Sequence, residues 1–287
     1  MPELPEIETI VRDLKTHIVG LSIDHIELRL PKMVKQPEGN FLTLLENNHF
    51  SKIRRRAKYL IFEINNSTNS MVVHLRMTGQ MIYKRENNFL AGGHGTKEDL
   101  KTLPNKFSHI IFYFVDGSQL FFNDMRQFGY LEIADENRMQ EIDVKLGVEP
   151  LEQEFTLEKF EKLLEKKKVN IKSFLLNQKF VVGLGNIYVD ETLFDAEVLP
   201  NRPVNSLAKS EIKKIYKAII RVLRQAVKER GTTFNDYRDA NGNKGNFFNF
   251  LKVYGRSGKK CKRCKSNVLK KNKIAGRGTV YCRVCQK

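Results

Sequence analysis

The chain has 287 residues, enough for two domains, and its hydrophobic content of 41% can fill real cores. Lysine and arginine total 50 against 33 acidic residues, so the formal net charge is +17, which favours a polyanionic partner. No apolar run approaches the ~20 residues of a membrane span, and no secretory signal pattern opens the chain. We therefore expect a soluble, cytoplasmic protein without a membrane partner.

The first six residues, MPELPE, stand directly before a stretch with helical spacing of apolar residues. This spacing runs over residues 4–19 and ends at Gly20, which predicts an amphipathic helix. If Met1 is removed, Pro2 presents a secondary amine, and an α-amino group titrates near ~8. Such an amine can attack an electrophilic sugar carbon and form an iminium, with Glu3 and Glu6 as proton carriers. The alternative is that Pro and Glu simply begin a helix well.

Short β-type runs replace the helical spacing between residues 21 and 133. These runs predict a β-sandwich or barrel with the N-terminal helix along its side. Residues 84–107 are polar and show no period, so we expect a long mobile loop there. The predicted strands are 23–30, 59–64, 71–75, 109–115, 119–122 and 130–133, and residues 41–45 add a short helix.

Helical spacing returns after residue 155 and predicts a mainly α second domain. Residues 134–155 are predicted to be a linker, and 231–249 a loop rich in Gly, Asn and Asp. The run GLGNIY at 183–188 lacks the third glycine of a dinucleotide-binding fingerprint and does not follow a strand, so we reject that interpretation. Asn186, at a helix start, can still place backbone amides near a phosphate. The predicted helices are 157–164, 171–176, 186–194 and 207–229.

All four cysteines lie within the last 27 residues, as two CxxC pairs: Cys261, Cys264, Cys282 and Cys285. This spacing predicts a tetrahedral structural zinc site, with disulfides or redox chemistry as the alternative. Residues 257–287 hold eleven basic and no acidic residues. Because a purely structural module has no need of that charge, nucleic-acid contact is favoured. Glycines flank Arg277, so no neighbouring side chain restricts how far the arginine side chain can extend.

Two further motifs point to DNA. The run RRRAKY at 54–59 leads into a strand, where Lys58 can meet a phosphate; the alternative is a solvated basic face. The run DMRQFG at 124–129 places Arg126 and Phe128 two residues apart, just before a strand. That pair suits a wedge between stacked bases. The alternative is a turn whose Phe packs inward.

Taken together, the motifs resemble the bacterial formamidopyrimidine-DNA glycosylase family over nearly the whole chain. The resemblance implies an α+β fold with four parts: a catalytic N-terminal β-sandwich domain with flanking helices (1–135), a linker (136–155), a helix–two-turn–helix domain with a lesion-capping loop (156–250) and a zinc finger (251–287). Leu4, where the related endonuclease VIII branch carries Gly, favours the purine-directed branch. The motifs are MPELPEIET, RRAKYLIFE, HLRMTG, DMRQFG, VVGLGNIYVDE, VYGRSGKKCKRC and AGRGTVYCRVCQ.

The resemblance implies a bifunctional base-excision repair glycosylase and abasic-site lyase. It would remove oxidised purines, such as 8-oxoguanine and formamidopyrimidines, through a Pro2 Schiff base followed by β,δ-elimination. Pro2 would attack C1′ of the sugar, and Glu3 would handle protons there with support from Glu6. Lys58 would act in β-elimination and contact phosphate. Arg277 would bind the lesion phosphates and assist δ-elimination.

The resemblance also implies a set of DNA contacts. Met77, Arg126 and Phe128 would fill the gap left by the flipped nucleotide, and the loop at 231–249 would cap the extruded base. The partner would be double-stranded DNA with oxidised purines or abasic sites, held in a cleft by a monomer that associates with the nucleoid. One structural zinc and no organic cofactor are expected. The remaining DNA contacts would be His74, His109, Lys167 and Asn186.

Three departures from the family pattern leave local DNA contacts and the opposite-base preference open. The segment between Gly79 and His109 is longer than expected, Phe107 replaces a DNA-contacting His, and Gln127 replaces a second Arg in the wedge motif. Two other hypotheses remain: a catalytically silent, zinc-dependent protein that binds distorted duplex, and a single-strand or RNA-binding accessory protein. The first has no use for a free Pro2 amine, and the second needs an aromatic row that the sequence lacks.

Overall fold

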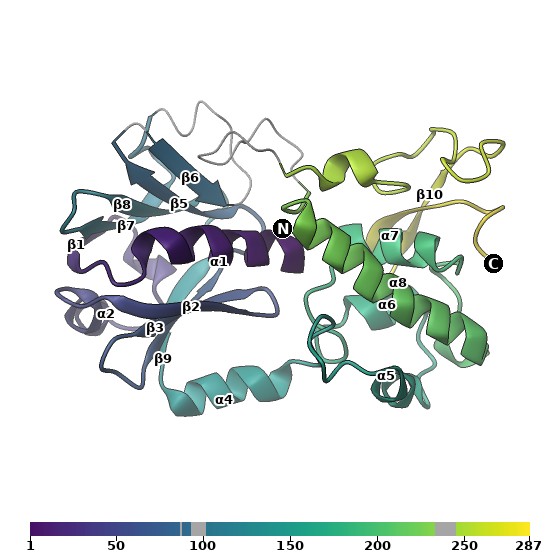
Figure 1. Ribbon diagram of the computed structural model, residues 1–287, viewed down its shortest axis with the longest axis horizontal. Coiled ribbons are helices and arrows are strands. Elements are labelled where there is room, and N and C mark those ends of the chain that lie inside the picture. The colour runs from purple at the N-terminus through teal and green to yellow at the C-terminus, as the bar shows by residue number, and fades with distance from the viewer. Residues whose placement is uncertain (87, 93–101, 233–244) are drawn as a thin grey trace. The chain divides into compact units, whose positions relative to one another are not determined.

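The computed structural model describes residues 1–86, 88–92, 102–232 and 245–287. They form two compact units, one made of Met1–Asp143 with Glu229–Asn246 and the other of Val144–Lys228 with Phe247–Lys287. Both units are drawn in Figure 1. Within these described ranges, no helix has both the length and the apolar character needed to cross a membrane.

The first unit is a β-sandwich of two antiparallel sheets. Its strands are β1 (Ile23–Leu28), β2 (Phe50–Arg56), β3 (Tyr59–Ile64), β4 (Ser70–His74), β5 (Gly79–Arg85), β6 (Asn88–Gly92), β7 (Ser108–Phe114), β8 (Gln119–Asp124) and β9 (Tyr130–Ala134). One sheet has the order β1-β7-β8-β5-β6 and the other β2-β3-β4-β9. The helices of this unit are α1 (Leu4–Ile18), η1 (Pro31–Met33), α2 (Glu38–Leu45) and α4 (Glu136–Lys145). Helix α1 runs along the margin between the two sheets (Figure 1).

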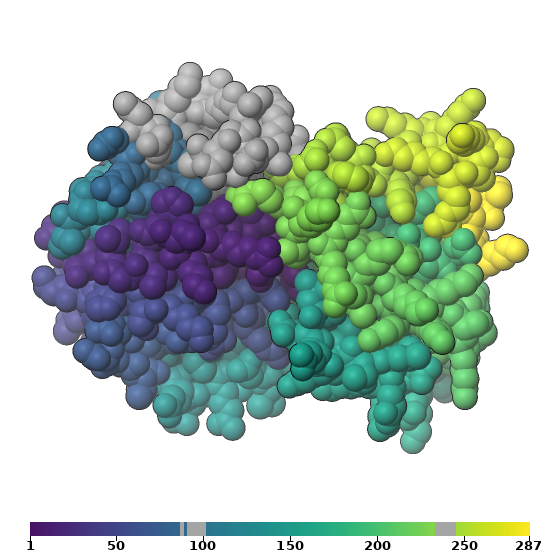
Figure 2. Space-filling view, in the orientation of Figure 1, coloured from purple at the N-terminus to yellow at the C-terminus, as the bar shows by residue number. Residues whose placement is uncertain are grey.

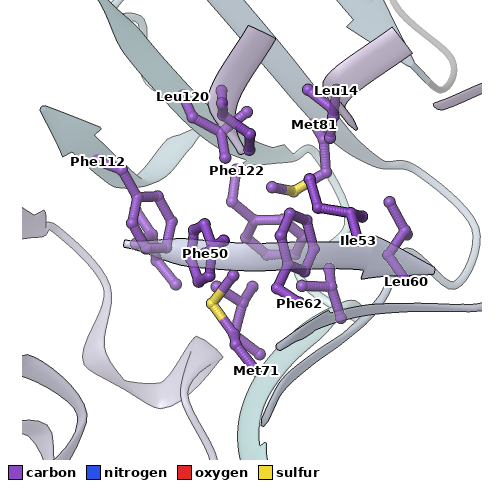
Figure 3. Packing of buried hydrophobic residues seen from close by; sticks show 14 of the residues in the cluster. Leu14, Phe50, Ile53, Leu60, Phe62, Met71, Met81, Phe112, Leu120 and Phe122 are labelled. Atoms are coloured by element: carbon purple, nitrogen blue, oxygen red, sulfur yellow. The ribbon is translucent and has the colours of Figure 1, made fainter. Parts of the chain in front are cut away.

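The core of this unit lies between the sheets and includes the inner face of α1. Figure 3 shows the rings of Phe50, Phe62 and Phe112 gathered there, and the Phe50 and Phe62 centroids are 5.0 Å apart. Leu14 of α1 belongs to the same buried cluster. Each large apolar side chain buried in this way contributes roughly 1.5–3 kcal/mol. The outer face of α1 reaches the surface (Figure 2), but its inner face is fixed by the core, so the helix start has a defined position.

The predicted β-sandwich is confirmed, but strands β2 and β5 were not predicted, and two predicted segments differ from the structure. Residues 84–107 are not one loop, because β5 and β6 pair as a hairpin with Tyr83 opposite Leu90. Residues 93–101 lie outside the described part of the chain. The predicted linker contains helix α4, whose one buried residue is Ile142. An apolar pattern this sparse cannot be recognised as helical from sequence.

The second unit is built around one helix buried on all sides. Its elements are α5 (Leu157–Leu164), α6 (Ile171–Leu176), α7 (Asn186–Asp195), η2 (Val204–Ser206), α8 (Lys209–Lys228), η3 (Phe247–Phe250), β10 (Lys270–Ile274) and β11 (Arg277–Tyr281). Every side chain from Ile187 to Phe194 in α7 is buried, as expected for a helix enclosed by its neighbours. Strand β11 packs on α7 and joins a small core with Val253, Leu269 and the cysteines.

The mainly helical second domain and its C-terminal cysteine module are therefore confirmed. Helices α5 and α6 have the predicted bounds, and their starts are capped by the side chains of Thr156 and Asn170. Such caps satisfy backbone amides that the first helical turn leaves unpaired. Of the predicted loop at 231–249, residues 233–244 lie outside the described part of the chain, and Phe247 and Phe248 fall in η3.

Candidate active site and zinc module

The start of α1 is shaped by two glutamates. Glu3 is the N-cap residue, and its side chain and that of Glu6 cap each other's backbone in a reciprocal capping box. The Glu3 N–H donates to Oε2 of Glu6 over 2.8 Å. Glu3 is only 3% exposed, and Pro2 is buried beside it. The beginning of the chain is therefore held at one place in the first unit.

The terminal amine lies among charged groups that bear on its chemistry. Burial lowers the pKa of the Met1 amine, nearby Glu3 and Glu6 oppose that shift, and Lys58 lowers the pKa further. With Met1 in place the Pro2 nitrogen is an amide. Removal of Met1 would move the amine one residue along, next to the same carboxylates. An amine with a lowered pKa is neutral, and so nucleophilic, at a lower pH.

Lys58 is placed by a tight turn between β2 and β3. Arg56 pairs with Tyr59 across the two strands, so Ala57 and Lys58 form a two-residue connection, with Ala57 left-handed at φ 52°. The basic run thus ends one strand and forms the turn, whereas the sequence had suggested only a strand start. Lys58 itself is buried, and it is one of the groups that act on the terminal amine.

Glu6 has a second partner that the sequence pattern does not reveal. Its Oε1 accepts a hydrogen bond from the Thr232 N–H over 2.7 Å. A Cβ added to Gly231 would lie 2.7 Å from the same oxygen, so a side chain at this position would have to displace the Glu6 carboxylate. Thr232 also bridges Asn246. Glu6 therefore links the start of α1 to the base of the predicted lesion-capping loop.

The three predicted wedge residues are brought together on the first unit. One guanidinium nitrogen of Arg126 lies 3.1 Å from the Met77 sulfur, and the guanidinium carbon lies 4.7 Å from the Phe128 ring centroid. Met77 is 41% exposed and Phe128 53% exposed. Phe128 does not pack inward, so the alternative of an ordinary turn with a buried Phe is wrong.

The two predicted histidine contacts have different environments. Nδ1 of His74 accepts the Arg76 N–H over 3.0 Å, which leaves the proton of the neutral ring on Nε2. Burial, together with the charges of Arg76 and Lys58, lowers the pKa of His74 to about 3. His109 is 5% exposed, and its Nε2 lies 2.7 Å from the Asp124 carbonyl oxygen. The structure therefore places the His109 ring in the interior, bonded to the strand that leads into the wedge.

Arg277 lies at the tip of the β10–β11 hairpin in the second unit. Ala275 and Gly276 form its two-residue turn, both with positive φ, as the tightest hairpins require. Nδ2 of Asn186, at the start of α7, donates to the Gly278 carbonyl over 3.0 Å. Asn186 therefore holds the strand next to the exposed Arg277. Lys167 lies elsewhere in the unit, with Nζ 4.8 Å from the Phe180 ring centroid.

Two buried acids of α7 hold the C-terminal module, and no sequence motif assigned them a role. Asp190 pairs with Lys172 over 2.6 Å, both side chains being fully buried, and accepts the Val280 N–H over 3.0 Å. Glu191 accepts the amides of residues 252–254. Burial raises the pKa of both acids, that of Asp190 to about 6. The only available signal was a pair of adjacent acids in the middle of a mostly apolar helix.

The four cysteines converge as predicted. Their sulfur atoms all lie within 4.8 Å of one another, and the Cys261–Cys285 and Cys264–Cys282 sulfur pairs are each 3.8 Å apart. A tetrahedron of thiolates at ~2.3 Å from zinc has edges of about 3.8 Å, so the donor set fits that ion. Nδ2 of Asn267 lies 3.5 Å from the Cys282 sulfur, the kind of outer contact that orients a metal ligand.

Comparison with known proteins identifies the family. Residues 1–131 match the formamidopyrimidine-DNA glycosylase N-terminal domain, and residues 146–237 match the H2TH domain of the same enzymes. A formamidopyrimidine-DNA glycosylase of Pelotomaculum thermopropionicum is 40% identical over 290 residues, covering 100% of this chain and 99% of the relative. One from Desulfitobacterium hafniense is 41% identical over 289 residues, covering 100% of both. The chain belongs to the formamidopyrimidine-DNA glycosylase family.

Solved structures agree with this assignment. Lactococcus lactis Fpg in complex with abasic-site DNA is 36% identical, with a TM-score of 0.88 and 99% of each chain covered. The same enzyme with DNA containing Fapy-dG is 36% identical, with a TM-score of 0.87 and coverage of 99% and 100%. The resemblance drawn from the sequence motifs is confirmed, and the protein is a DNA glycosylase of base-excision repair.

Proposed function

We propose that the protein is bifunctional: it excises oxidised purines such as 8-oxoguanine and formamidopyrimidines, and it then cleaves the strand as an abasic-site lyase. The observation that carries the proposal is the position of the chain's terminal amine. Glu3, Glu6 and Lys58 all act on that amine, and its pKa is lowered. A DNA-binding protein without catalytic activity has no need of a pre-positioned terminal amine beside two carboxylates.

In the proposed first step, Pro2 acts as the nucleophile after Met1 has been removed. The nitrogen lone pair attacks C1′ of the damaged nucleotide, the bond from C1′ to the base breaks, and the base leaves with a proton. Opening of the sugar ring then gives an iminium between Pro2 and C1′. Glu3, which is buried at the helix start, would give and take protons at the sugar. Glu6 supports it through the capping box.

In the proposed lyase steps, the iminium acts as an electron sink. Loss of a proton from C2′ expels the 3′ phosphate, and a second elimination expels the 5′ phosphate. Lys58 supplies a positive charge near the amine and assists the first elimination. Arg277, exposed at its hairpin tip, binds phosphate and assists the second. Water finally releases Pro2 from the sugar fragment.

The proposed partner is duplex DNA with an oxidised purine or an abasic site. The net charge of +17 supports a polyanionic partner, and the Lactococcus lactis relative was solved with both kinds of damaged DNA. Met77, Arg126 and Phe128 would replace the flipped nucleotide in the stack. We also propose that His74, which keeps Nε2–H as a donor, contacts the backbone together with Lys167 and Asn186, and that the cysteines hold one zinc.

Borohydride trapping tests this function. Duplexes carrying 8-oxoguanine, a ring-opened purine, an oxidised pyrimidine or an abasic site are incubated with the protein and borohydride, and the covalent adducts are quantified by mass spectrometry. We expect adducts with the two purine lesions and with an abasic site. A variant that retains Met1 is the matched control, because only its Pro2 nitrogen is blocked. An adduct of equal yield with that control would mean that another amine, a lysine or the Met1 amine itself, is the nucleophile, and it would overturn the proposal.

A further inference from the structure

We propose that Asp124 is the positioning residue that sets the shape of the wedge, an inference that rests on the function proposed above. Asp124 ends β8, directly before the loop that carries Arg126 and Phe128. Its side chain is 1% exposed. Nothing in the sequence distinguishes it from an ordinary turn-forming aspartate.

The Asp124 carboxylate gathers three backbone amides of the wedge loop. Oδ1 accepts the Arg126 N–H over 3.1 Å. Oδ2 accepts the Phe128 N–H over 2.9 Å and the Gly129 N–H over 2.7 Å. One side chain therefore fixes the backbone of both wedge residues in this loop. A carboxylate suits the task because it only accepts hydrogen bonds and has two oxygens for several donors.

The same carboxylate also ties in the second turn of the wedge. The Thr78 hydroxyl donates to Oδ1 of Asp124, and its oxygen lies 3.1 Å from the Arg126 backbone nitrogen. Thr78 directly follows Met77, and Gly79 pairs with Asp124 across β5 and β8. A single buried carboxylate thus anchors both turns of the wedge, the one that carries Met77 and the one that carries Arg126 and Phe128.

The backbone of Asp124 is fixed by a hydrogen bond, and steric contacts restrict the conformation of the loop that follows it. The His109 ring bonds to the Asp124 carbonyl oxygen over 2.7 Å. A Cβ on Gly129 would lie 2.9 Å from the Phe122 ring and 3.1 Å from Oδ2 of Asp124. Gln127, between the two wedge residues, is left-handed at φ 54°. The loop is therefore fixed before DNA arrives, so little ordering remains to oppose insertion.

The test replaces Asp124 by asparagine, which keeps the shape but places an NH2 group against backbone donors in either orientation. Asp116→Asn is the matched control. Asp116 accepts the Ser118 N–H over 3.0 Å in the turn at the other end of β8, away from the wedge. Thr78→Val is a milder second variant that removes only the hydroxyl link. Thermal unfolding verifies that each variant is folded.

Two readouts separate positioning from simple destabilisation. The first is the fluorescence of 2-aminopurine opposite an uncleavable tetrahydrofuran site, read at saturating protein, which reports insertion in the bound complex. The second compares excision of 8-oxoguanine with strand cutting at a pre-formed abasic site. We expect Asp124→Asn to lose most of the saturated signal and about tenfold in excision, equivalent to about 1.4 kcal/mol. Abasic-site cutting should stay within about threefold, since no base has to be unstacked.

Thr78→Val should show the same pattern in weaker form, and Asp116→Asn should match the wild type. An unchanged saturated signal in Asp124→Asn, or an equal loss in Asp116→Asn, would overturn the proposal. The fluorescence readout involves no chemistry, so it remains valid even if Pro2 is not the nucleophile. Failure of the proposed function would appear separately, as a wild-type protein that gives no trapped adduct.

Discussion

Replacing Lys172 by methionine should destabilise the second unit strongly. Lys172 and Asp190 form an ion pair with both side chains fully buried, 2.6 Å apart. Methionine keeps most of the length of lysine but removes the ammonium, which leaves the Asp190 carboxylate buried without its cation. Removing one partner of a buried pair costs about 3–5 kcal/mol. Because Asp190 also accepts the Val280 amide, the β11 strand should loosen with it.

The loss of stability caused by Lys172→Met should depend on pH. Burial already raises the pKa of Asp190 to about 6, against the opposing effect of Lys172, so the pKa should rise further without the lysine. A carboxyl group whose folded pKa is raised binds more protons when folded than when unfolded, so its stability contribution falls as pH rises through that window. Each unit of additional shift is worth about 1.36 kcal/mol. The deficit of the variant should therefore be smaller at pH 5 than at pH 8.

Urea unfolding followed by circular dichroism at both pH values measures this effect. Asp190→Asn in the Lys172→Met background should recover part of the loss, because the amide is neutral and can still accept from Val280. Lys162→Met serves as the control, since Lys162 pairs with Glu158 on the exposed face of α5, and it should show no measurable change. A deficit equal at pH 5 and pH 8 would refute the reasoning that a buried, unpaired charge is its cause.

Three other outcomes follow from the site. Phe128→Ala should slow excision of a damaged base far more than cutting at a pre-formed abasic site, and equal losses would count against the wedge role. Cys261→Ser should lose both bound zinc, measured by elemental analysis, and DNA affinity, while the first unit stays folded. Full DNA affinity in the metal-free variant would contradict this prediction. Glu3→Gln should lose base excision yet keep some cutting at abasic sites, because the glycosidic bond is already absent in that substrate. Intact excision would show that Glu3 carries no essential proton.

The parts that could be predicted from sequence are those with a local signal. Helix α1 follows from apolar spacing and a glycine stop, and the cysteine module from ligand spacing. Strand β7 was also predicted, but the direction in which its side chains point was not, because the strand is buried on both faces. Because alternation is lost in such a strand, the inward position of His109 could not be separated from an outward one. The hairpin strand β6 was hidden by its polar surroundings.

The roles of Asp124, Asp190 and Glu191 could not be predicted, because each depends on backbone amides that are distant in sequence or on a loop whose shape is set by the fold. Asp190 meets a strand 90 residues away along the chain. A single acid within an apolar helix carries no information about which amide it will meet. Metal-ligand spacing is different, since thiolates at fixed intervals have few other uses.

The glutamate at the N-cap of α1 limits how this position can evolve. Helix stability alone favours Ser, Thr, Asp or Asn at an N-cap, and Glu is not among the preferred residues. A shorter acid would serve the helix but would withdraw its carboxylate by one methylene from the sugar at which we propose that Glu3 acts. Selection for thermostability without selection for repair should therefore drift this position toward Asp or Ser. Retention of glutamate under such selection would show that a structural role of the longer side chain, and not the chemistry, maintains it, because Ser or Asp would also form the capping box with Glu6.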